Sequence, residues 1–251
     1  MKDLLKRIAA SATGGDSKKP FEEIVPIYAK MGYKLFELYA TGRGSSPDYS
    51  KGAAFYSTKA REYGIAYSSL HLPAIVSGSN DSFEQAVKWL KFADELNIPV
   101  CVFNAAEKES YAMLLKKILP IAENLKPELV VQVHEGRSLD TLEAVKTVLK
   151  EVNHPKVKIL HELGSYHAIG EPWKKVIDEF WPRIGLFHLK DMAGPQSVPF
   201  GTGEIDFASL LTTVDSIGYK GNFVLELDPK DRENTNKYFA EAFKFFQRLS
   251  N

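Results

Sequence analysis

The sequence predicts an α/β protein, a single (β/α)8 TIM barrel domain over residues 1–251. Eight short apolar segments with strand character alternate with eight segments of helical periodicity. Successive strand segments begin about 25–35 residues apart, which is the size of one βα unit. No long linker or low-complexity tract interrupts the series, which favours a closed parallel barrel over an open sheet. A length of 251 residues is typical of one such barrel.

The elements follow from apolar runs and from helix stop signals. Strands are expected at 7–13, 33–39, 65–71, 99–104, 129–134, 157–162, 184–189 and 223–227. Each is followed by an expected helix, at 20–31, 47–63, 81–96, 110–125, 139–151, 171–180, 207–217 and 231–249. Gly32, Gly64 and Gly218 stand directly after three of these helices, where a helix commonly ends, and Asp206 is expected to cap the helix at 207–217.

Composition limits the class of protein. The chain has 32 Lys and Arg residues and 32 Asp and Glu residues, so its formal net charge is zero. A nucleic-acid partner normally requires a basic surface, and we therefore expect none. The N-terminal stretch lacks the apolar segment of a signal peptide, and no apolar run is long enough to span a membrane. We therefore expect a cytoplasmic protein without a membrane partner. Cys101, the single cysteine, is expected to be a small buried hydrophobic residue.

Polar and ionisable residues gather at the ends of the predicted strands. In a (β/α)8 barrel the active site is built at the C-terminal ends of the strands and in the loops that follow them. Burying ionisable groups costs free energy, so a purely structural barrel core has no use for many of them. The strand-end residues therefore predict an active site, and they are Glu37, His71, Asn104, Gln132, His134, His161, Glu162, His188, Lys190 and Glu226.

The last two predicted strands carry the most informative pair. The strand at 184–189 contains His188, and the strand at 223–227 contains Glu226. The helical segment at 207–217 lies between them, so the two strands should be parallel neighbours. His188 and Glu226 would then lie side by side at the same end of the sheet.

The order of motifs between Val130 and Pro229 resembles that of a known family. The chain reads His188-Leu-Lys-Asp, then Gly201-x-Gly-x-Ile-Asp-Phe, then Gly218-Tyr-x-Gly, then a strand with a Glu. This series resembles the C-terminal part of the xylose isomerase-like TIM barrels, the sugar phosphate isomerase/epimerase group. The combination is fairly specific for the superfamily and unspecific for the substrate.

The resemblance implies one divalent metal ion, Mn²⁺, Mg²⁺, Co²⁺ or Zn²⁺, with a ligand from each of the last four barrel strands. His188 and Glu226 match the family ligands directly. Glu162 stands where the family has an Asp, and Gln132 stands where the family usually has a Glu. A Gln can ligate through its amide oxygen, but it cannot act as a general base and it removes one negative charge. We therefore expect reduced metal occupancy, and the Gln argues against a two-base epimerisation.

The resemblance also implies catalytic and substrate-binding roles. Glu226 would be both a ligand and a base, and His134 or Lys190 would move the second proton. The substrate contacts expected from the strand ends and loops are Glu37, His71, His167 and Trp173.

Structural interpretations of the same residues stay open at this point. His188 could be a buried histidine bonded to a backbone carbonyl, and Glu226 could be only the ion-pair partner of Lys190. His161 and Glu162 point to opposite faces of one strand, so a slip of one residue in register would exchange them.

The expected function is a metal-dependent isomerase or epimerase of a small sugar, keto-sugar or polyol in carbohydrate metabolism, acting through proton abstraction and a metal-stabilised enediolate. A dehydration is equally compatible, because inosose dehydratase and 3-dehydroshikimate dehydratase share this barrel. One alternative is a catalytically degenerate sugar-binding barrel, which Gln132 favours. Another is an endonuclease IV-like DNA repair enzyme, which the zero net charge and only six histidines disfavour. A homo-oligomer is compatible with the sequence.

Overall fold

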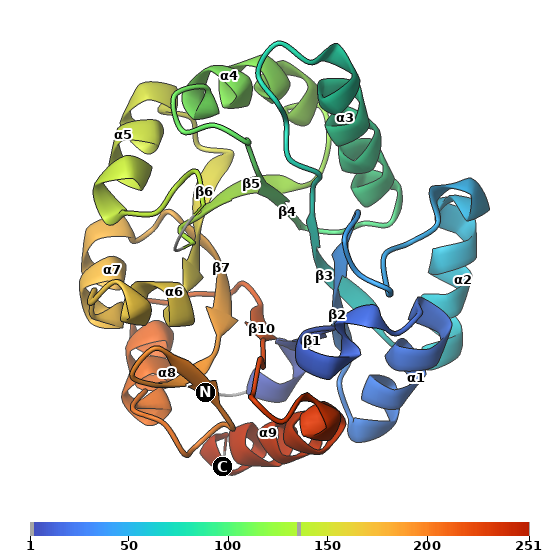
Figure 1. Ribbon diagram of the computed structural model, residues 1–251, viewed down its shortest axis with the longest axis vertical. Helices are drawn as coiled ribbons and strands as arrows, with labels where there is room; N and C mark the ends of the chain where they lie inside the picture. Colours follow the sequence, from blue (N-terminus) through green and yellow to red (C-terminus); the bar gives the residue numbers. More distant parts are fainter. Residues whose placement is uncertain (1–2, 135–136, 251) are drawn as a thin grey trace.

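Eight parallel strands close into a barrel in the computed structural model, which describes residues 3–134 and 137–250 (Figure 1). Their order around the barrel is β1-β10-β7-β6-β5-β4-β3-β2. The strands are β1 (Ile8–Ser11), β2 (Leu35–Tyr39), β3 (Ala66–His71), β4 (Val100–Phe103), β5 (Glu128–Gln132), β6 (Val157–Glu162), β7 (Ile184–Leu189) and β10 (Phe223–Leu225). The predicted (β/α)8 fold is confirmed, and β7 and β10 are parallel neighbours as expected.

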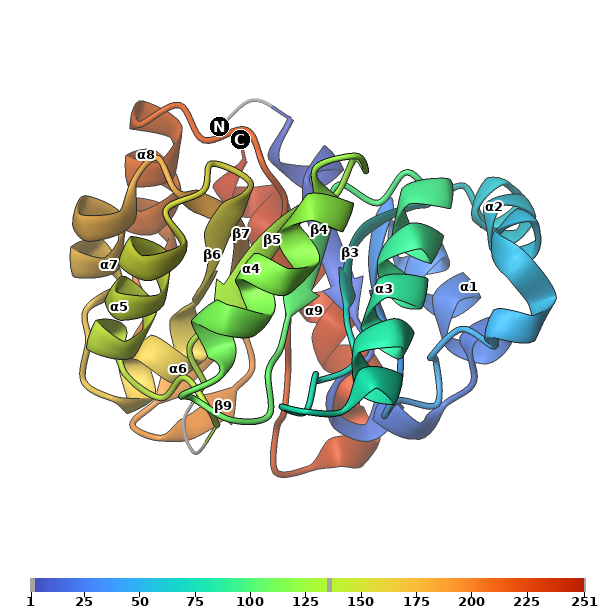
Figure 2. The same cartoon turned by 90° about the horizontal axis from the view of Figure 1, so that it is seen from above.

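Helices alternate with the strands and form a ring outside the barrel, as Figures 1 and 2 show. They are α1 (Phe21–Met31), α2 (Gly52–Tyr63), α3 (Asn80–Glu95), α4 (Tyr111–Ala122), α5 (Leu142–Val152), α6 (Leu163–Ala168), α7 (Trp173–Phe180), α8 (Phe207–Ser216) and α9 (Thr235–Leu249). Short 3₁₀ helices are η1 (Leu4–Lys6), η2 (Gly14–Lys18), η3 (Tyr49–Lys51) and η4 (Arg232–Asn234). Between residues 3 and 250, leaving out 135 and 136, no helix is long and apolar enough to cross a membrane.

Two features differ from the sequence prediction. Helix α6 follows β6 directly, and the loop after β7 contains an antiparallel hairpin of β8 (Asp191–Ala193) and β9 (Gln196–Val198). Both are too short to show a periodic pattern in the sequence. Predicted boundaries were also too generous: the strand expected at 129–134 ends at Gln132. There the chain leaves the sheet, because the backbone N–H of His134 donates to the carbonyl of Leu139 at 2.8 Å.

The barrel interior has an apolar layer with a polar layer above it. The apolar layer consists of Ala9, Val100, Val102, Val130, Leu160, Leu186 and Val224, with Leu35 packed against it. Side chains two positions apart on a strand face the same way. The next inward-facing residues on five strands are therefore Glu37, Gln132, Glu162, His188 and Glu226. The opposite faces of the strands pack against the helices in a larger apolar core.

The loop after β7 is built around a buried carboxylate. Asp191 accepts hydrogen bonds from the backbone N–H groups of Gly201 at 2.8 Å, Gly203 at 3.0 Å and Met192 at 3.0 Å. A Cβ atom at Gly203 would collide with the Asp191 carboxylate, so this position requires glycine. Asp206 accepts from the N–H of Ser209 at 3.0 Å and caps α8, as predicted. The conspicuous Asp and Gly-x-Gly motifs therefore fix the loop beside the end of β7.

Candidate active site

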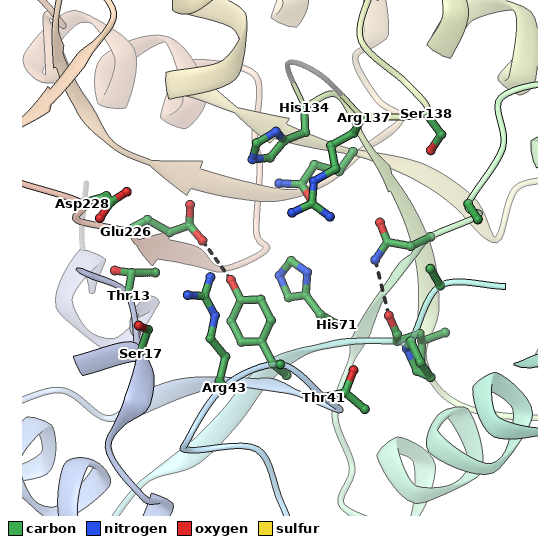
Figure 3. A pocket seen from close by; sticks show the side chains of 18 of the residues that line it. Thr13, Ser17, Thr41, Arg43, His71, His134, Arg137, Ser138, Glu226 and Asp228 are labelled. Carbon is green, nitrogen blue, oxygen red and sulfur yellow. Dashed lines mark hydrogen bonds between the residues drawn. The ribbon is translucent and has the colours of Figure 1, made fainter. Parts of the chain in front are cut away.

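A cavity of about 780 Å³ lies at the C-terminal end of the barrel, above the polar layer. Figure 3 shows the side chains that line it, which come from the loops after several strands. Of the predicted strand-end residues, those on the cavity wall are His71, Asn104, Gln132, His134, Lys190 and Glu226. Glu37, Glu162 and His188 are buried behind this wall. We call the residues that line the cavity its wall, and we call the buried residues Glu37, Glu162 and His188 behind them its floor.

His188 is the centre of the floor. Its Nδ1 donates to Oε2 of Glu162 at 2.9 Å, and its Nε2 donates to Oε2 of Glu37 at 3.0 Å. Oε1 of Glu226 lies 3.5 Å from the same Nδ1. Burial lowers the pKa of His188, but the negative charges of Glu37 and Glu226 outweigh burial and raise this pKa well above its usual value. His188 is therefore fully buried with both ring nitrogens facing carboxylates rather than a backbone carbonyl, and these carboxylates favour its protonated form.

Glu226 joins the floor to the cavity. Its Oε2 lies 3.1 Å from Nζ of Lys190, and its Oε1 accepts a hydrogen bond from the hydroxyl of Tyr39 at 3.0 Å. Burial raises the pKa of Glu226, but Lys190 and His188 outweigh burial and hold this pKa well below its usual value. The ion pair of Glu226 with Lys190 is real, and both partners line the cavity. An ionised carboxylate beside an ammonium group is therefore available to a bound molecule.

Glu37 belongs to the floor rather than to the wall. It is completely buried, and its Oε2 accepts from the Ser69 hydroxyl at 2.6 Å in addition to His188. Nε2 of His71 lies 3.4 Å from the same oxygen. Burial raises the pKa of Glu37, but His188 and His71 outweigh burial and lower this pKa. The contacts of Glu37 are thus with other side chains of the protein, whereas the sequence predicted a contact with the substrate.

The register of β6 places Glu162 inward and His161 outward. Glu162 pairs with His188 on β7, after a shift in the pairing between Ile159 and Leu160. His161 stacks on Phe187 with ring centres 5.0 Å apart, and its Nε2 donates to the carbonyl of Trp173 at 2.9 Å. Burial lowers the pKa of His161 to about 4. The sequence had left these two residues exchangeable.

Gln132 lies next to Glu162. Its Nε2 donates to Oε2 of Glu162 at 3.2 Å. The amide thus occupies the expected position on β5, but it presents a hydrogen-bond donor to the neighbouring carboxylate. Glu135 and Gly136, which complete the strand-five motif, lie outside the described residues.

The donor set of the floor fits a divalent cation. Ligand atoms of Glu162, His188 and Glu226 all lie within 4.8 Å of one another, and Glu37, His71 and His188 form a second such group. Carboxylate oxygens and imidazole nitrogens are ligands of Mn²⁺, Mg²⁺, Co²⁺ and Zn²⁺. Oε1 of Glu162 is buried and has no hydrogen-bond partner in the described part of the chain. A cation would satisfy this oxygen, which is otherwise costly to bury.

Several wall residues escaped the sequence analysis, and Tyr39, Arg43 and Arg137 are the most informative of them. The ring of Tyr39 stacks on His71, with centres 4.1 Å apart and planes at 11°. The guanidinium of Arg43 lies 4.6 Å from the Tyr39 ring centre, and Arg137 reaches the cavity from the loop after β5. Tyr39 could have been found, because it lies two positions after Glu37 on the same strand face. The two arginines lie in loops whose paths have no periodic signal.

Two expected substrate contacts lie elsewhere. Nε2 of His167 lies 3.2 Å from Oε2 of Glu204, and the side chain of Trp173 packs against the apolar core. Neither residue is among those that line the cavity.

Comparison with known proteins identifies relatives among sugar-converting enzymes. An inosose dehydratase of Geobacillus thermodenitrificans is 27% identical over 147 residues, which are 51% of this chain and 49% of the relative. An L-ribulose-5-phosphate 3-epimerase of Salmonella paratyphi C is 22% identical over 130 residues, which are 51% of this chain and 46% of the relative. The chain spans about half the length of the curated relatives it matches.

Solved structures share the fold over nearly the whole chain. The IolI protein with a zinc atom superposes with a TM-score of 0.79 at 16% identity, covering 97% of this chain and 98% of the other. D-Psicose 3-epimerase of Clostridium cellulolyticum H10 gives a TM-score of 0.76 at 14% identity, covering 98% and 99%. The family model described as Xylose isomerase-like TIM barrel matches residues 25–249. The chain therefore belongs to the xylose isomerase-like TIM barrel family.

Proposed function

We propose that this protein is a metal-dependent enzyme that isomerises, epimerises or dehydrates a small sugar, keto-sugar or polyol. The observation that carries the proposal is the cluster of Glu162, His188 and Glu226, whose ligand atoms lie within 4.8 Å of one another behind a polar cavity. The names of the curated relatives, inosose dehydratase and L-ribulose-5-phosphate 3-epimerase, support this class of reaction and substrate.

The proposed metal site uses residues of three strands. Glu162, Glu226 and Nδ1 of His188 would hold one divalent ion, because this nitrogen faces both carboxylates at 2.9 and 3.5 Å. When bound, the ion supplies a Lewis acid that polarises a substrate carbonyl. Gln132 is the proposed fourth ligand, and it would have to give up its hydrogen bond to Glu162 to present its amide oxygen.

Glu226 is the proposed base. It lines the cavity, whereas Glu162 and His188 are buried behind the wall. Lys190, 3.1 Å from Glu226, is the proposed acid, and His134 on the wall is the other candidate for the second proton. In an elimination, Glu226 would take the proton next to the carbonyl and Lys190 would protonate the departing hydroxyl, leaving a double bond and water.

Dehydration is the outcome that this set of residues suits best. Two-base epimerisation needs a second group that takes or returns a proton on the other side of the substrate carbon. The family position for that group on β5 holds Gln132, which cannot do so, and His134 would have to take its place in an epimerisation. One carboxylate beside an ammonium group is sufficient for the loss of water.

The first test is metal content. Protein stripped with chelator and reloaded with Mn²⁺, Mg²⁺, Co²⁺ or Zn²⁺ should retain about one ion per chain by mass spectrometry. The variants His188→Ala and Glu226→Ala should lose it. His154→Ala is the matched control, because His154 pairs with Glu123 at 3.0 Å and does not line the cavity. Binding that is equal in all four proteins would refute the site.

The second test is turnover of keto-sugars and inososes in D₂O, followed by NMR. Loss of water with a new double bond would establish dehydration. Deuterium incorporation with interconversion of two sugars would establish isomerisation or epimerisation. Retention of the metal without either reaction on any of these substrates would count against an enzyme and for the sugar-binding barrel.

A further inference from the structure

Among the residues that the structure describes, two arginines of the cavity have no acidic partner. Four basic and two acidic side chains of this described part line the cavity. Lys190 is paired with Glu226 at 3.1 Å, and Arg232 is paired with Asp228 at 3.0 Å. Within residues 3–134 and 137–250, neither Arg43 nor Arg137 forms an ion pair. The described part of the wall therefore has an excess of two positive charges before any ion binds to the floor.

Arg43 is held in place next to the proposed reactive end of the cavity. It is half-buried, with its guanidinium 4.6 Å from the centre of the Tyr39 ring. Tyr39 is itself fixed, since it stacks on His71 and donates to Glu226 at 3.0 Å. A guanidinium ordered by stacking loses less entropy when it binds a ligand. Its hydrogen-bonding edge remains available, because stacking uses only the face of the group.

Arg137 approaches from the other side of the cavity. Its backbone N–H donates to the carbonyl of His134 at 3.0 Å, so Arg137 is anchored beside the end of β5. Figure 3 shows the side chains of Arg43 and Arg137 entering the cavity from opposite walls, with His71 between them. Two arginine forks that converge on one space suit the oxygens of a carboxylate or phosphate.

We propose that the substrate carries an anionic group, a carboxylate or a phosphate, which Arg43 and Arg137 bind while its carbonyl end lies toward Glu226. The assignment of the two ends rests on the proposed function, whereas the binding of the anion does not. This subsite would make the enzyme selective for sugar acids or sugar phosphates over neutral sugars. The paired Lys190 and Arg232 would contribute less, because their charges are already balanced.

The test measures binding without turnover. Calorimetry on chelator-stripped protein compares D-gluconate and D-glucitol 6-phosphate, which carry a carboxylate and a phosphate, with neutral D-glucitol. Wild-type protein should bind at least one of the two anions more tightly than D-glucitol. Arg43→Met and Arg137→Met should each weaken that binding by about 10-fold or more, the usual effect of losing a hydrogen bond to a charged group. The anion with the larger loss identifies the group.

Control variants separate local from general effects. Arg61→Met removes the same charge from the exposed face of α2, outside the cavity, and should leave the binding unchanged. Arg43→Lys keeps the positive charge but lacks the paired N–H donors of the guanidinium. Thermal melts establish that each variant is folded. Equal binding of both anions by wild type, Arg43→Met and Arg137→Met would overturn the proposal, as would equal weakening by Arg61→Met. Failure of turnover with intact anion binding would count only against the proposed function.

Discussion

Glu37 is expected to orient His188, and Glu37→Gln is the sharpest test of the buried floor. Oε2 of Glu37 accepts from Nε2 of His188 at 3.0 Å, which leaves Nδ1 facing Glu162 and Glu226. A carboxylate can only accept, so it keeps a proton on Nε2 and leaves Nδ1 available as a ligand. A Gln at this position can also donate, which would stabilise the opposite tautomer with its proton on Nδ1.

The expected loss of metal affinity follows from what is known of residues that hydrogen-bond to a metal-binding histidine. Replacing the hydrogen-bond partner of a metal-binding histidine typically costs 10–100-fold in metal affinity. This corresponds to about 1.4–2.7 kcal/mol of binding free energy. Glu37 is completely buried and Gln has nearly the same shape, so packing around the site should change little. The effect should therefore fall on metal affinity more than on the fold.

The assay is calorimetric titration of chelator-stripped protein with Zn²⁺ and Mn²⁺ at pH 7. Ser69→Ala is the control, because it removes the hydroxyl that donates to Glu37 at 2.6 Å and leaves the carboxylate in place. Its loss of affinity should be smaller than that of Glu37→Gln. Nitrogen-15 NMR of the histidines should report less protonation of Nε2 of His188 in Glu37→Gln than in wild type. Wild-type affinity and unchanged protonation of Nε2 in Glu37→Gln would refute the reasoning.

Three further predictions concern stability and charge. Burial lowers the pKa of His161 to about 4. Below about pH 6.5 the unfolded chain therefore binds a proton that the folded chain does not. The free energy of unfolding should fall by about 3 kcal/mol between pH 6.5 and 4 because of this residue. Urea titrations of His161→Phe should lack this part of the pH dependence, and an unchanged slope would contradict the assignment. Gln132→Glu puts a second carboxylate where the amide now lies 3.2 Å from Glu162; it should lower the melting temperature of stripped protein and tighten Mn²⁺ binding by about 10-fold, whereas unaltered Mn²⁺ binding would remove Gln132 from the site. Asp191→Asn places an amide against backbone donors and should cost about 2–4 kcal/mol in urea unfolding; wild-type stability would show that the loop does not depend on this carboxylate.

The sequence by itself determined the barrel and most of its ionisable floor. Strand segments and helical segments alternate along the chain, and two-residue periodicity places Glu162, His188 and Glu226 on inward faces once the register is known. Gln132 could also be recognised as a departure without any structure, because the resemblance to the family implies a Glu at this strand-end position.

Tertiary structure decided the register and the wall. Glu162 rather than His161 faces the interior, because Glu162 lies two positions after the inward-facing Leu160, and the sequence alone did not establish which face of β6 is the inner one. Glu37 was expected to contact a substrate, but closure of the barrel brings it against His188 from the other half of the chain. Arg43 and Arg137 meet at one cavity because β2 and β5 end at the same rim, and loop paths carry no periodicity from which this could be predicted.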